Sequence, residues 1–348
     1  MHDNRYDLTP VLAAYPADCQ PAGGKPCLVA GGFSGSTIWR FSTLRGPVCM
    51  RRWPREHPSA TQLQWIHSVL ARTAATGFDR IPLPISTAQN ATFVESQGHL
   101  WELAPWLPGE SDNAASPEKI SSLPRIAAAA AALALFHVAA AVDRAHRYPA
   151  TKAPGLQSRL DRMRQLSTSG LEQLGSVIKD HRNRWPELAS RADCLLDDYQ
   201  RAALTIEPRL RSAASVVVSI TPCIRDIHRE HVLFEGEQVT GIIDFGAMQT
   251  DNVACDIARL MGSMARDDAS VWKHGLTAYQ QYHPLTDAEL QLVRAYDEST
   301  VLLSGINWLR WVFDEGRTFS NPTAVLARFD QNAARLRQLA SKSASTSV

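Results

Sequence analysis

Residues 223–246, CIRDIHREHVLFEGEQVTGIIDFG, place two aspartates, Asp226 and Asp244, at the outer ends of two strand-like segments. The segments are HVLF (231–234) and VTGIIDF (239–245), and the polar EGEQ between them is typical of a turn. In an antiparallel hairpin the start of the first strand neighbours the end of the second. The sequence therefore predicts that Asp226 and His231 lie close to Asp244. Two carboxylates that converge at one end of a hairpin favour a bound divalent cation and a phosphate substrate.

The composition of the chain indicates a globular protein of two lobes or two domains. Its 348 residues exceed one minimal core, and 45% of them are hydrophobic and 20% charged. The formal net charge is +1, so no global field draws the protein to nucleic acid or to an anionic membrane. We expect neither nucleic acid nor membrane as a partner.

Several features predict a cytoplasmic protein. The first residues, MHDNRYDLTP, lack the basic and apolar regions of a signal peptide. The six cysteines, at 19, 27, 49, 194, 223 and 255, show no C-x-x-C spacing, which fits free thiols in a reducing compartment. The apolar run 126–142 is rich in alanine and interrupted by His137, which favours a buried helix over a membrane span.

Hydrophobic periodicity predicts an α+β fold with a small β-rich lobe (1–104) and a large, mostly helical lobe (105–348). In the first lobe, residues 28–53 indicate three strands, 59–75 a helix, and 91–107 a hairpin that turns at Gln97-Gly98. In the second, helices are expected near 117–145, 156–180 and 186–206 and from about 254 onward. A strand-rich segment at 215–246 lies between them.

The motifs IRDIHREHVLF and GIIDFG resemble the paired motifs of the aminoglycoside phosphotransferase and choline kinase family, which has a two-lobed protein-kinase-like fold. The resemblance implies that Asp226 is the catalytic aspartate, which orients or deprotonates the acceptor hydroxyl, and that Arg225 supports it in the catalytic loop. Asp244 matches the aspartate that binds metal. Asp256, in CDIARL, matches a further aspartate for which we expect a structural role.

The N-terminal segment extends the resemblance over roughly residues 28–315. AGGFSGSTIWRF (30–41) is similar to the glycine turn that covers nucleotide phosphates, because glycine allows close backbone approach. VCMR (48–51) places Arg51 where the family has a lysine that contacts phosphate, with Arg52 as the alternate. LWELAPWLPGE (100–110) resembles the segment that joins the lobes and holds adenine. The implied nucleotide-binding residues are Gly31, Gly32, Ser34, Gly35, Ser36, Arg51, Glu102 and Ala104.

Three positions depart from the family pattern. Ile224 replaces a mainly structural histidine, and Arg51 keeps the charge of the lysine but adds a fork that can bind phosphate with two donors. His231 stands where the family has the asparagine that binds a second metal ion, and a ring nitrogen suits Mn²⁺ or Zn²⁺ better than Mg²⁺. A glutamate that would pair with Arg51 from the helix is also missing, since glutamines stand at 62 and 64.

Other interpretations of these residues remain open. Asp226, His228 and His231 have a spacing that a zinc site could use, although further ligands at suitable spacing are lacking nearby. The two aspartates could also be turn residues. The segment INWLRWVFDEGRTF (306–319) could form an acceptor wall with Trp308, Trp311, Phe313, Asp314 and Glu315, but core packing is the commoner explanation for such aromatics.

The preferred interpretation is an ATP-dependent phosphotransferase that acts on a hydroxyl of a small molecule, such as an amino sugar or amino alcohol. Asp244 and His231 would hold the metal, Mg²⁺ or, because of His231, Mn²⁺. The alternative is a nucleotide-binding pseudokinase with a sensing or scaffold role, which Arg51, His231 and the missing glutamate favour. A protein kinase ranks last, because no A-P-E segment is recognisable.

Overall fold

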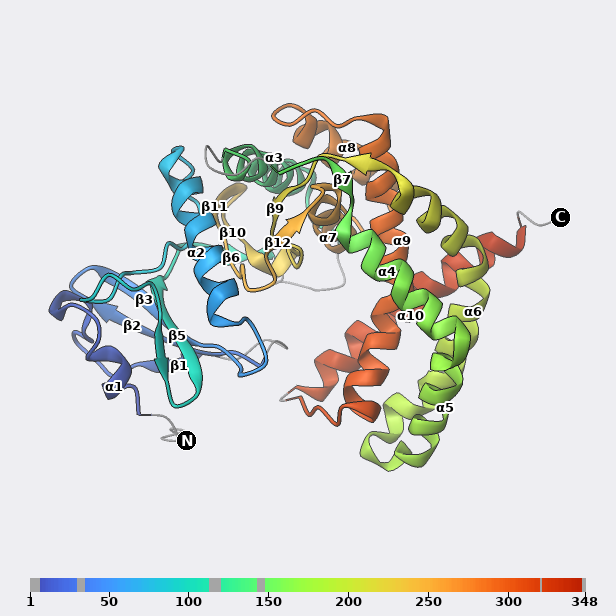
Figure 1. Ribbon diagram of the computed structural model, residues 1–348, viewed down its shortest axis with the longest axis horizontal. Helices are drawn as coiled ribbons and strands as arrows, with labels where there is room; N and C mark the ends of the chain where they lie inside the picture. Colours follow the sequence, from blue (N-terminus) through green and yellow to red (C-terminus); the bar gives the residue numbers. More distant parts are fainter. Residues whose placement is uncertain (1–6, 30–34, 113–119, 143–147, 320, 346–348) are drawn as a thin grey trace. The chain divides into compact units, whose positions relative to one another are not determined.

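The computed structural model describes residues 7–29, 35–112, 120–142, 148–319 and 321–345. The chain divides into two compact units, and Figure 1 shows the helices and strands of both. The first comprises Met1–Arg147, Ile224–Gln249 and Lys273–His283, and the second comprises Tyr148–Cys223, Thr250–Trp272 and Pro284–Val348.

A five-stranded antiparallel sheet dominates the N-terminal part of the first unit, with the order β1-β2-β3-β5-β4. Left-handed backbone conformations allow its tight turns: Gly46, the first residue of β3, has φ 102° at the turn from β2, and Gln97 and Gly98 have φ 55° and 71° between β4 and β5. The turn at Gln97-Gly98 is the one that the sequence predicts. The strands are β1 (Cys27–Val29), β2 (Thr37–Thr43), β3 (Gly46–Arg52), β4 (Val94–Ser96) and β5 (His99–Pro105).

The two faces of this sheet differ in chemistry. Val48, Met50, Trp101 and Leu103 belong to a buried apolar cluster with residues of the preceding segments α1 (Thr9–Leu12) and η1 (Ala17–Cys19). Successive side chains of a strand point to opposite faces. Arg51, which pairs across β3 and β5 with Glu102, therefore lies on the other face together with that carboxylate.

Helix α2 (Ala60–Ala75) follows the sheet, as the sequence predicts for 59–75. Ser59 caps it, because its hydroxyl accepts a hydrogen bond from the backbone N–H of Gln62. Leu63 of this helix packs with Trp53 and Leu100, so α2 is held against the ends of β3 and β5.

A second, three-stranded sheet of the first unit has the order β11-β10-β6. It consists of β6 (Glu110–Ser111), β10 (Val232–Glu235) and β11 (Gln238–Ile242), and the short helix η5 (Arg229–His231) leads into β10. Val232 pairs with Ile242, which confirms the predicted hairpin. Gly236, with φ 60°, turns the chain between its strands.

Helix α3 (Leu123–Ala140) is alanine-rich and packs against this part of the first unit. It is the one helix of the described residues that is long and apolar enough to cross a membrane by length and composition. However, 56% of its apolar window is buried inside the protein. Phe136, on its buried face, lies between Phe78 and Phe245, with ring centroids 5.9 and 5.6 Å away. This packing supports the predicted core helix.

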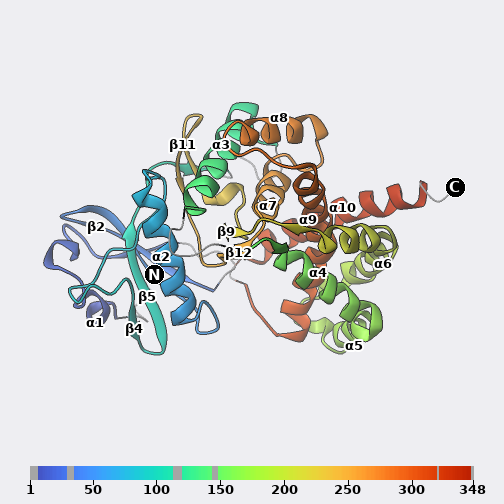
Figure 2. The same cartoon turned by 45° about the horizontal axis from the view of Figure 1, so that its top comes forward.

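The second unit is mainly helical, and Figure 2 shows its long helices α6 and α9 beside α10. Helix α6 continues through Pro208, past the predicted end at 206, because Ile206 and Leu210 on either side are both buried. Short strands β7 (Thr151–Lys152), β8 (Val217–Val218), β9 (Thr221–Cys223) and β12 (Gln249–Asp251) accompany the helices. The helices are α4 (Pro154–Gln165), α5 (Leu171–Asp180), α6 (Pro186–Ser215), α7 (Ala254–Met264), α9 (Asp287–Leu309) and α10 (Pro322–Ser345); α8 (Ala269–Gln280) runs from one unit into the other.

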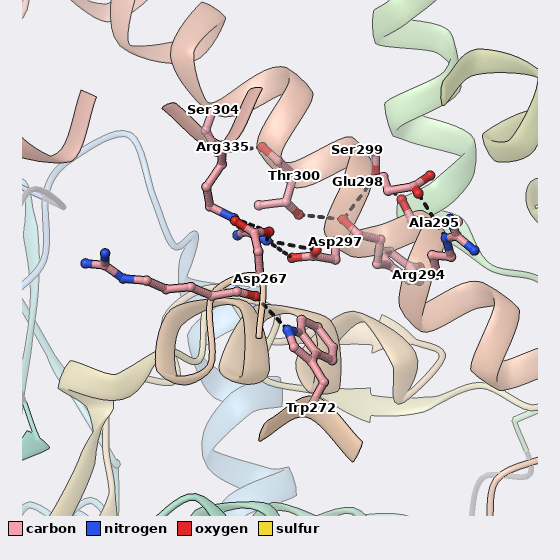
Figure 3. Close-up of polar contacts among 12 residues, drawn as sticks. Asp267, Trp272, Arg294, Ala295, Asp297, Glu298, Ser299, Thr300, Ser304 and Arg335 are labelled. Atoms are coloured by element: carbon pink, nitrogen blue, oxygen red, sulfur yellow. Dashed lines mark hydrogen bonds and ion pairs between the residues drawn. The ribbon is translucent and has the colours of Figure 1, made fainter. Parts of the chain in front are cut away.

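The C-terminal helix α10 is fixed by an arginine shared between two carboxylates (Figure 3). Arg335 Nη2 lies 2.8 Å from Asp267 Oδ1 and 3.0 Å from Asp297 Oδ2. Gly262 leaves room for this group, since a Cβ there would lie 2.7 Å from an oxygen of Asp297. The ion pairs join the segment after α7 to α9 and α10.

Candidate active site

The loop before β10 presents Asp226 to solvent between two wholly buried isoleucines, Ile224 and Ile227. These apolar neighbours anchor the loop on either side of the carboxylate. Arg225 adopts φ 67°, a left-handed conformation that is uncommon for a side chain of this size, and its guanidinium donates a hydrogen bond to Gln249 Oε1. The arginine thus tethers the loop to the segment after Asp244, although its catalytic role stays a prediction.

His231 connects the Asp226 loop to Asp244. Its Nδ1 lies 2.9 Å from the carbonyl oxygen of Asp226, and its Nε2 lies 3.6 Å from Asp244 Oδ2. A carbonyl can only accept, so Nδ1 carries the proton and donates it. In the neutral ring, the lone pair then resides on Nε2, the nitrogen that faces the carboxylate. A ring nitrogen with a free lone pair beside a carboxylate oxygen fits a divalent metal ion.

Asp244 follows β11 at φ 67° and accepts a hydrogen bond of 2.8 Å from Arg51 Nη1. Burial alone would raise the pKa of Asp244, but the positive charge of Arg51, joined by that of His231 whenever its ring is protonated, outweighs burial, so the pKa lies below its usual value. The carboxylate is therefore ionised at neutral pH, which is the form that binds metal. Gly246, two residues later, allows the ring of Trp53 to approach, since a Cβ there would lie 2.6 Å from that ring.

Arg51 lies between two carboxylates and above an aromatic ring. Besides the bond to Asp244, its Nε lies 3.7 Å from Glu102 Oε1, and its guanidinium carbon lies 4.6 Å from the centre of the Trp53 ring. Burial works against the charge of the guanidinium, but Asp244 and then Glu102 raise the pKa of Arg51. Arg52, the alternate, instead donates to Thr37 Oγ1 at 3.1 Å on the same sheet.

Sequence reasoning missed a histidine that binds the other oxygen of Glu102. His67 Nε2, on α2, lies 2.8 Å from Glu102 Oε2, and its Nδ1 lies 2.8 Å from Thr92 Oγ1. Gln62, five residues earlier on α2, donates to the carbonyl oxygen of Met248 in the loop after Asp244. The pairing of β3 with β5 sets Arg51 opposite Glu102. A correct prediction of this strand pairing would have identified Glu102 as the partner of Arg51.

The sequence also did not reveal a buried ionic cluster behind the Asp226 loop. Arg229 Nη2 binds Asp112 Oδ2 at 2.8 Å, and Arg125 Nη1 binds Asp112 Oδ1 at 2.9 Å. The hydroxyl of Ser121 donates to Asp112 as well. This cluster joins η5 to the segment after β6 and the start of α3, and so it fixes the loop that carries Asp226 and His231.

The structure describes only some of the other predicted nucleotide-binding residues. Gly31, Gly32 and Ser34 lie outside the described residues. Gly35 has φ 77°, a conformation that glycine adopts easily, and Ser36 directly precedes β2. Ala104 is buried on β5 opposite Cys49. Nucleotide contacts of all these residues stay predictions.

Several of the remaining candidates are buried in the way that core residues are, whereas Trp311 is half-buried and Asp314 and Glu315 are exposed. His228 is 8% exposed, and its ring centre lies 3.8 Å from that of His231. In the second unit, Asp256 is fully buried in the first turn of α7. Trp308 is also buried, with its ring 5.0 Å from that of Trp311. Core packing therefore explains Trp308, as expected for such aromatics.

Three features fit the class of phosphotransferases with a protein-kinase-like fold. They are the sheet with a basic residue on β3, the hairpin with Asp226 at its entrance, and the carboxylate after the second strand of that hairpin. The model of the phosphotransferase enzyme family matches residues 27–291. The chain therefore belongs to this family, which confirms the predicted resemblance and the predicted small-molecule kinase. Comparison with curated protein sequences gives no match.

Solved structures of similar fold agree with this assignment. An aminoglycoside phosphotransferase from Alicyclobacillus acidocaldarius is 16% identical, with 99% of this chain and 98% of that chain covered and a TM-score of 0.57. An amicoumacin kinase in complex with AMP-PNP, Ca²⁺ and Ami is 14% identical, with 98% and 94% covered and a TM-score of 0.65. A choline/ethanolamine kinase family protein from Mesorhizobium loti is 17% identical, with 94% and 97% covered and a TM-score of 0.54. The likenesses confirm the predicted α+β, kinase-like fold.

Proposed function

We propose that this chain transfers the γ-phosphoryl group of ATP to a hydroxyl of a small molecule, of the amino sugar or amino alcohol kind. The single observation that carries the proposal is the convergence of Arg51 and His231 on Asp244, next to the loop of Asp226. A cationic fork, an ionised carboxylate and an exposed second carboxylate are the groups that phosphoryl transfer requires. The amicoumacin kinase of similar fold, in complex with AMP-PNP and Ca²⁺, supports a nucleotide and a divalent cation.

Each residue has a distinct role in this proposal. Asp226 accepts a hydrogen bond from the acceptor hydroxyl, orients its oxygen toward the phosphorus, and takes its proton as transfer proceeds. Asp244 and His231 would hold Mg²⁺ or Mn²⁺, which would neutralise phosphate charge. Arg51 contacts phosphate oxygens with its fork. We propose that residues 1–104 form the nucleotide-binding lobe and that 105–348 supply the catalytic loop and the acceptor site.

Release of ADP in a screen of hydroxylated metabolites, run with Mg²⁺ and with Mn²⁺, tests the proposal. The Asp226→Ala variant serves as the control and should lose about 10²-fold or more in turnover while it still binds AMP-PNP. An acceptor that stimulates ADP release only in the unaltered protein supports the proposal. Near-normal turnover in the Asp226→Ala variant contradicts it.

One observation favours the alternative of a nucleotide-binding pseudokinase. Arg51 forms an ion pair with Asp244, so a cation must compete with the guanidinium for that carboxylate. Binding of AMP-PNP without transfer to any acceptor, in either metal, would select this alternative.

A further inference from the structure

The proposed binding of a metal ion changes the balance of charge around Arg51. In the structure its guanidinium binds Asp244, the carboxylate that the proposal assigns to the metal. A divalent cation on Asp244 would repel the guanidinium and weaken that ion pair. Arg51 then needs a second anion that keeps it beside the site, or its long side chain becomes free to adopt other rotamers.

Glu102 lies where such a second anion is needed. It is the cross-strand neighbour of Arg51, with one oxygen 3.7 Å from the arginine Nε, and the two side chains are only 14% and 13% exposed. Water therefore screens the attraction of this pair less than that of a surface pair. Asp244 and Glu102 contact different nitrogens of the fork, Nη1 and Nε. The guanidinium can lose one carboxylate and retain the other.

His67 fixes the orientation of Glu102. Its side chain is only 3% exposed, and its Nε2 donates to Glu102 Oε2, because an ionised carboxylate only accepts. Its Nδ1 can then accept from the hydroxyl of Thr92, 2.8 Å away, so that both nitrogens of the neutral ring are satisfied. With Oε2 bound in this way, Oε1 is the oxygen that faces Arg51.

We propose that Glu102 and His67 are positioning residues that replace the missing helix glutamate and hold Arg51 in place when metal binds Asp244. The carboxylate comes from β5, and α2 contributes the histidine that orients it. The amide of Gln62 ties the same helix to the carbonyl of Met248, so α2 contacts both Glu102 and the loop after Asp244. This inference rests on the nucleotide and metal binding in the proposed function, but not on the transfer step.

A double-mutant cycle between His67 and Arg51 tests the proposal. His67→Phe removes both hydrogen bonds, adds no charge and retains an aromatic ring against Phe93. Arg51→Met removes the guanidinium. The affinity of each variant for AMP-PNP in the presence of Mn²⁺ is measured by calorimetry, with adenosine, which lacks phosphates, as a second ligand. Ser68→Ala, at the exposed neighbour on the same helix, is the matched control.

We expect His67→Phe to weaken AMP-PNP binding about tenfold in the unaltered protein and less than about twofold in the Arg51→Met background. Adenosine affinity should stay the same, and so should every affinity of the Ser68→Ala variant. Equal losses in both backgrounds would overturn the proposal, because His67 would then act without Arg51. So would an unchanged affinity in either single variant.

Two further measurements keep this test decisive. Thermal unfolding shows whether His67→Phe is folded. If it is not folded, Thr92→Val can be used instead, because it removes only the hydroxyl that binds His67 Nδ1. This variant should show a smaller loss of AMP-PNP affinity that again depends on Arg51. A loss of affinity that is independent of Arg51 overturns the proposal. The ADP-release screen reports separately on transfer. A cycle that shows coupling without any turnover rejects the proposed phosphotransferase activity and retains the positioning role.

Discussion

The position of Asp297, which shares Arg335 with Asp267, predicts that the free energy of unfolding falls as the pH rises. Asp297 binds Arg335 Nη2 at 3.0 and 3.3 Å, but the same guanidinium also binds Asp267 at 2.8 Å (Figure 3). Burial raises the pKa of Asp297, and Arg335, which is shared with Asp267, offsets only part of this effect. The pKa of Asp297 rises from 3.8 to about 6.

This shift converts into a free energy of unfolding. A rise of about two pKa units corresponds to roughly 3 kcal/mol. Because the folded-state pKa lies above the unfolded-state value, the stabilising contribution is fully present below about pH 4. It is lost as the pH rises through about 6, since the folded protein must then carry a negative charge on the partly buried Asp297.

Replacement of Asp297 by asparagine isolates this contribution. The amide has nearly the same shape but cannot ionise, so we expect equal stability of variant and unaltered protein near pH 4. At pH 7 we expect the variant to be more stable by up to about 3 kcal/mol. Urea unfolding of both proteins at each pH measures the difference in their free energies of unfolding. Groups that titrate in the same way in both proteins do not contribute to this difference. A variant that is less stable at pH 7 would show that the ion pair with Arg335 outweighs burial.

Three further predictions concern the site and its support. His231→Asn should lower the ratio of activity with Mn²⁺ to activity with Mg²⁺ by about tenfold, because an amide oxygen replaces a ring nitrogen; ADP-release rates in the two metals measure it. Gly246→Ala should reduce turnover and the thermal midpoint together, because the new methyl group would lie 2.6 Å from the ring of Trp53; an unchanged midpoint would contradict the close packing. Asp112→Ala should cost about 3–5 kcal/mol in urea unfolding, because it removes the carboxylate that binds the buried Arg229 at 2.8 Å.

The hairpin of the site was predictable because local patterns determine it. Two apolar segments, a polar turn with a glycine and the antiparallel rule suffice to bring His231 near Asp244, and the structure places them 3.6 Å apart. The position of Asp226 at the entrance follows from the same register. The catalytic and metal-binding roles of these residues stay predictions, as does the division into lobes at residue 104.

The environment of Arg51 was not predictable from local patterns. Its partner was expected on the helix, where only glutamines stand, and Glu102 was assigned to the segment that holds adenine. The pairing of β3 with β5 joins segments about fifty positions apart, and a shift of one residue would move Glu102 to the opposite face. The contact of His67 with Glu102 was not predictable either. Helical spacing indicates that position 67 is buried on α2, but the bond to Glu102 depends on how the helix packs on the sheet.

The geometry of an arginine at position 51 suits a carboxylate at position 102. A lysine carries one compact ammonium group, whereas the guanidinium of arginine offers donors in a fixed planar fork. That fork reaches Asp244 through Nη1 while Nε faces a strand residue on its other side, and the ring of Trp53 lies beneath the plane. A glutamate on the neighbouring strand then suffices as counter-charge, and the helix need only supply a neutral group that orients it. The absence of a helix glutamate is therefore compatible with an ordered Arg51 guanidinium, for which phosphate contact is the proposed role.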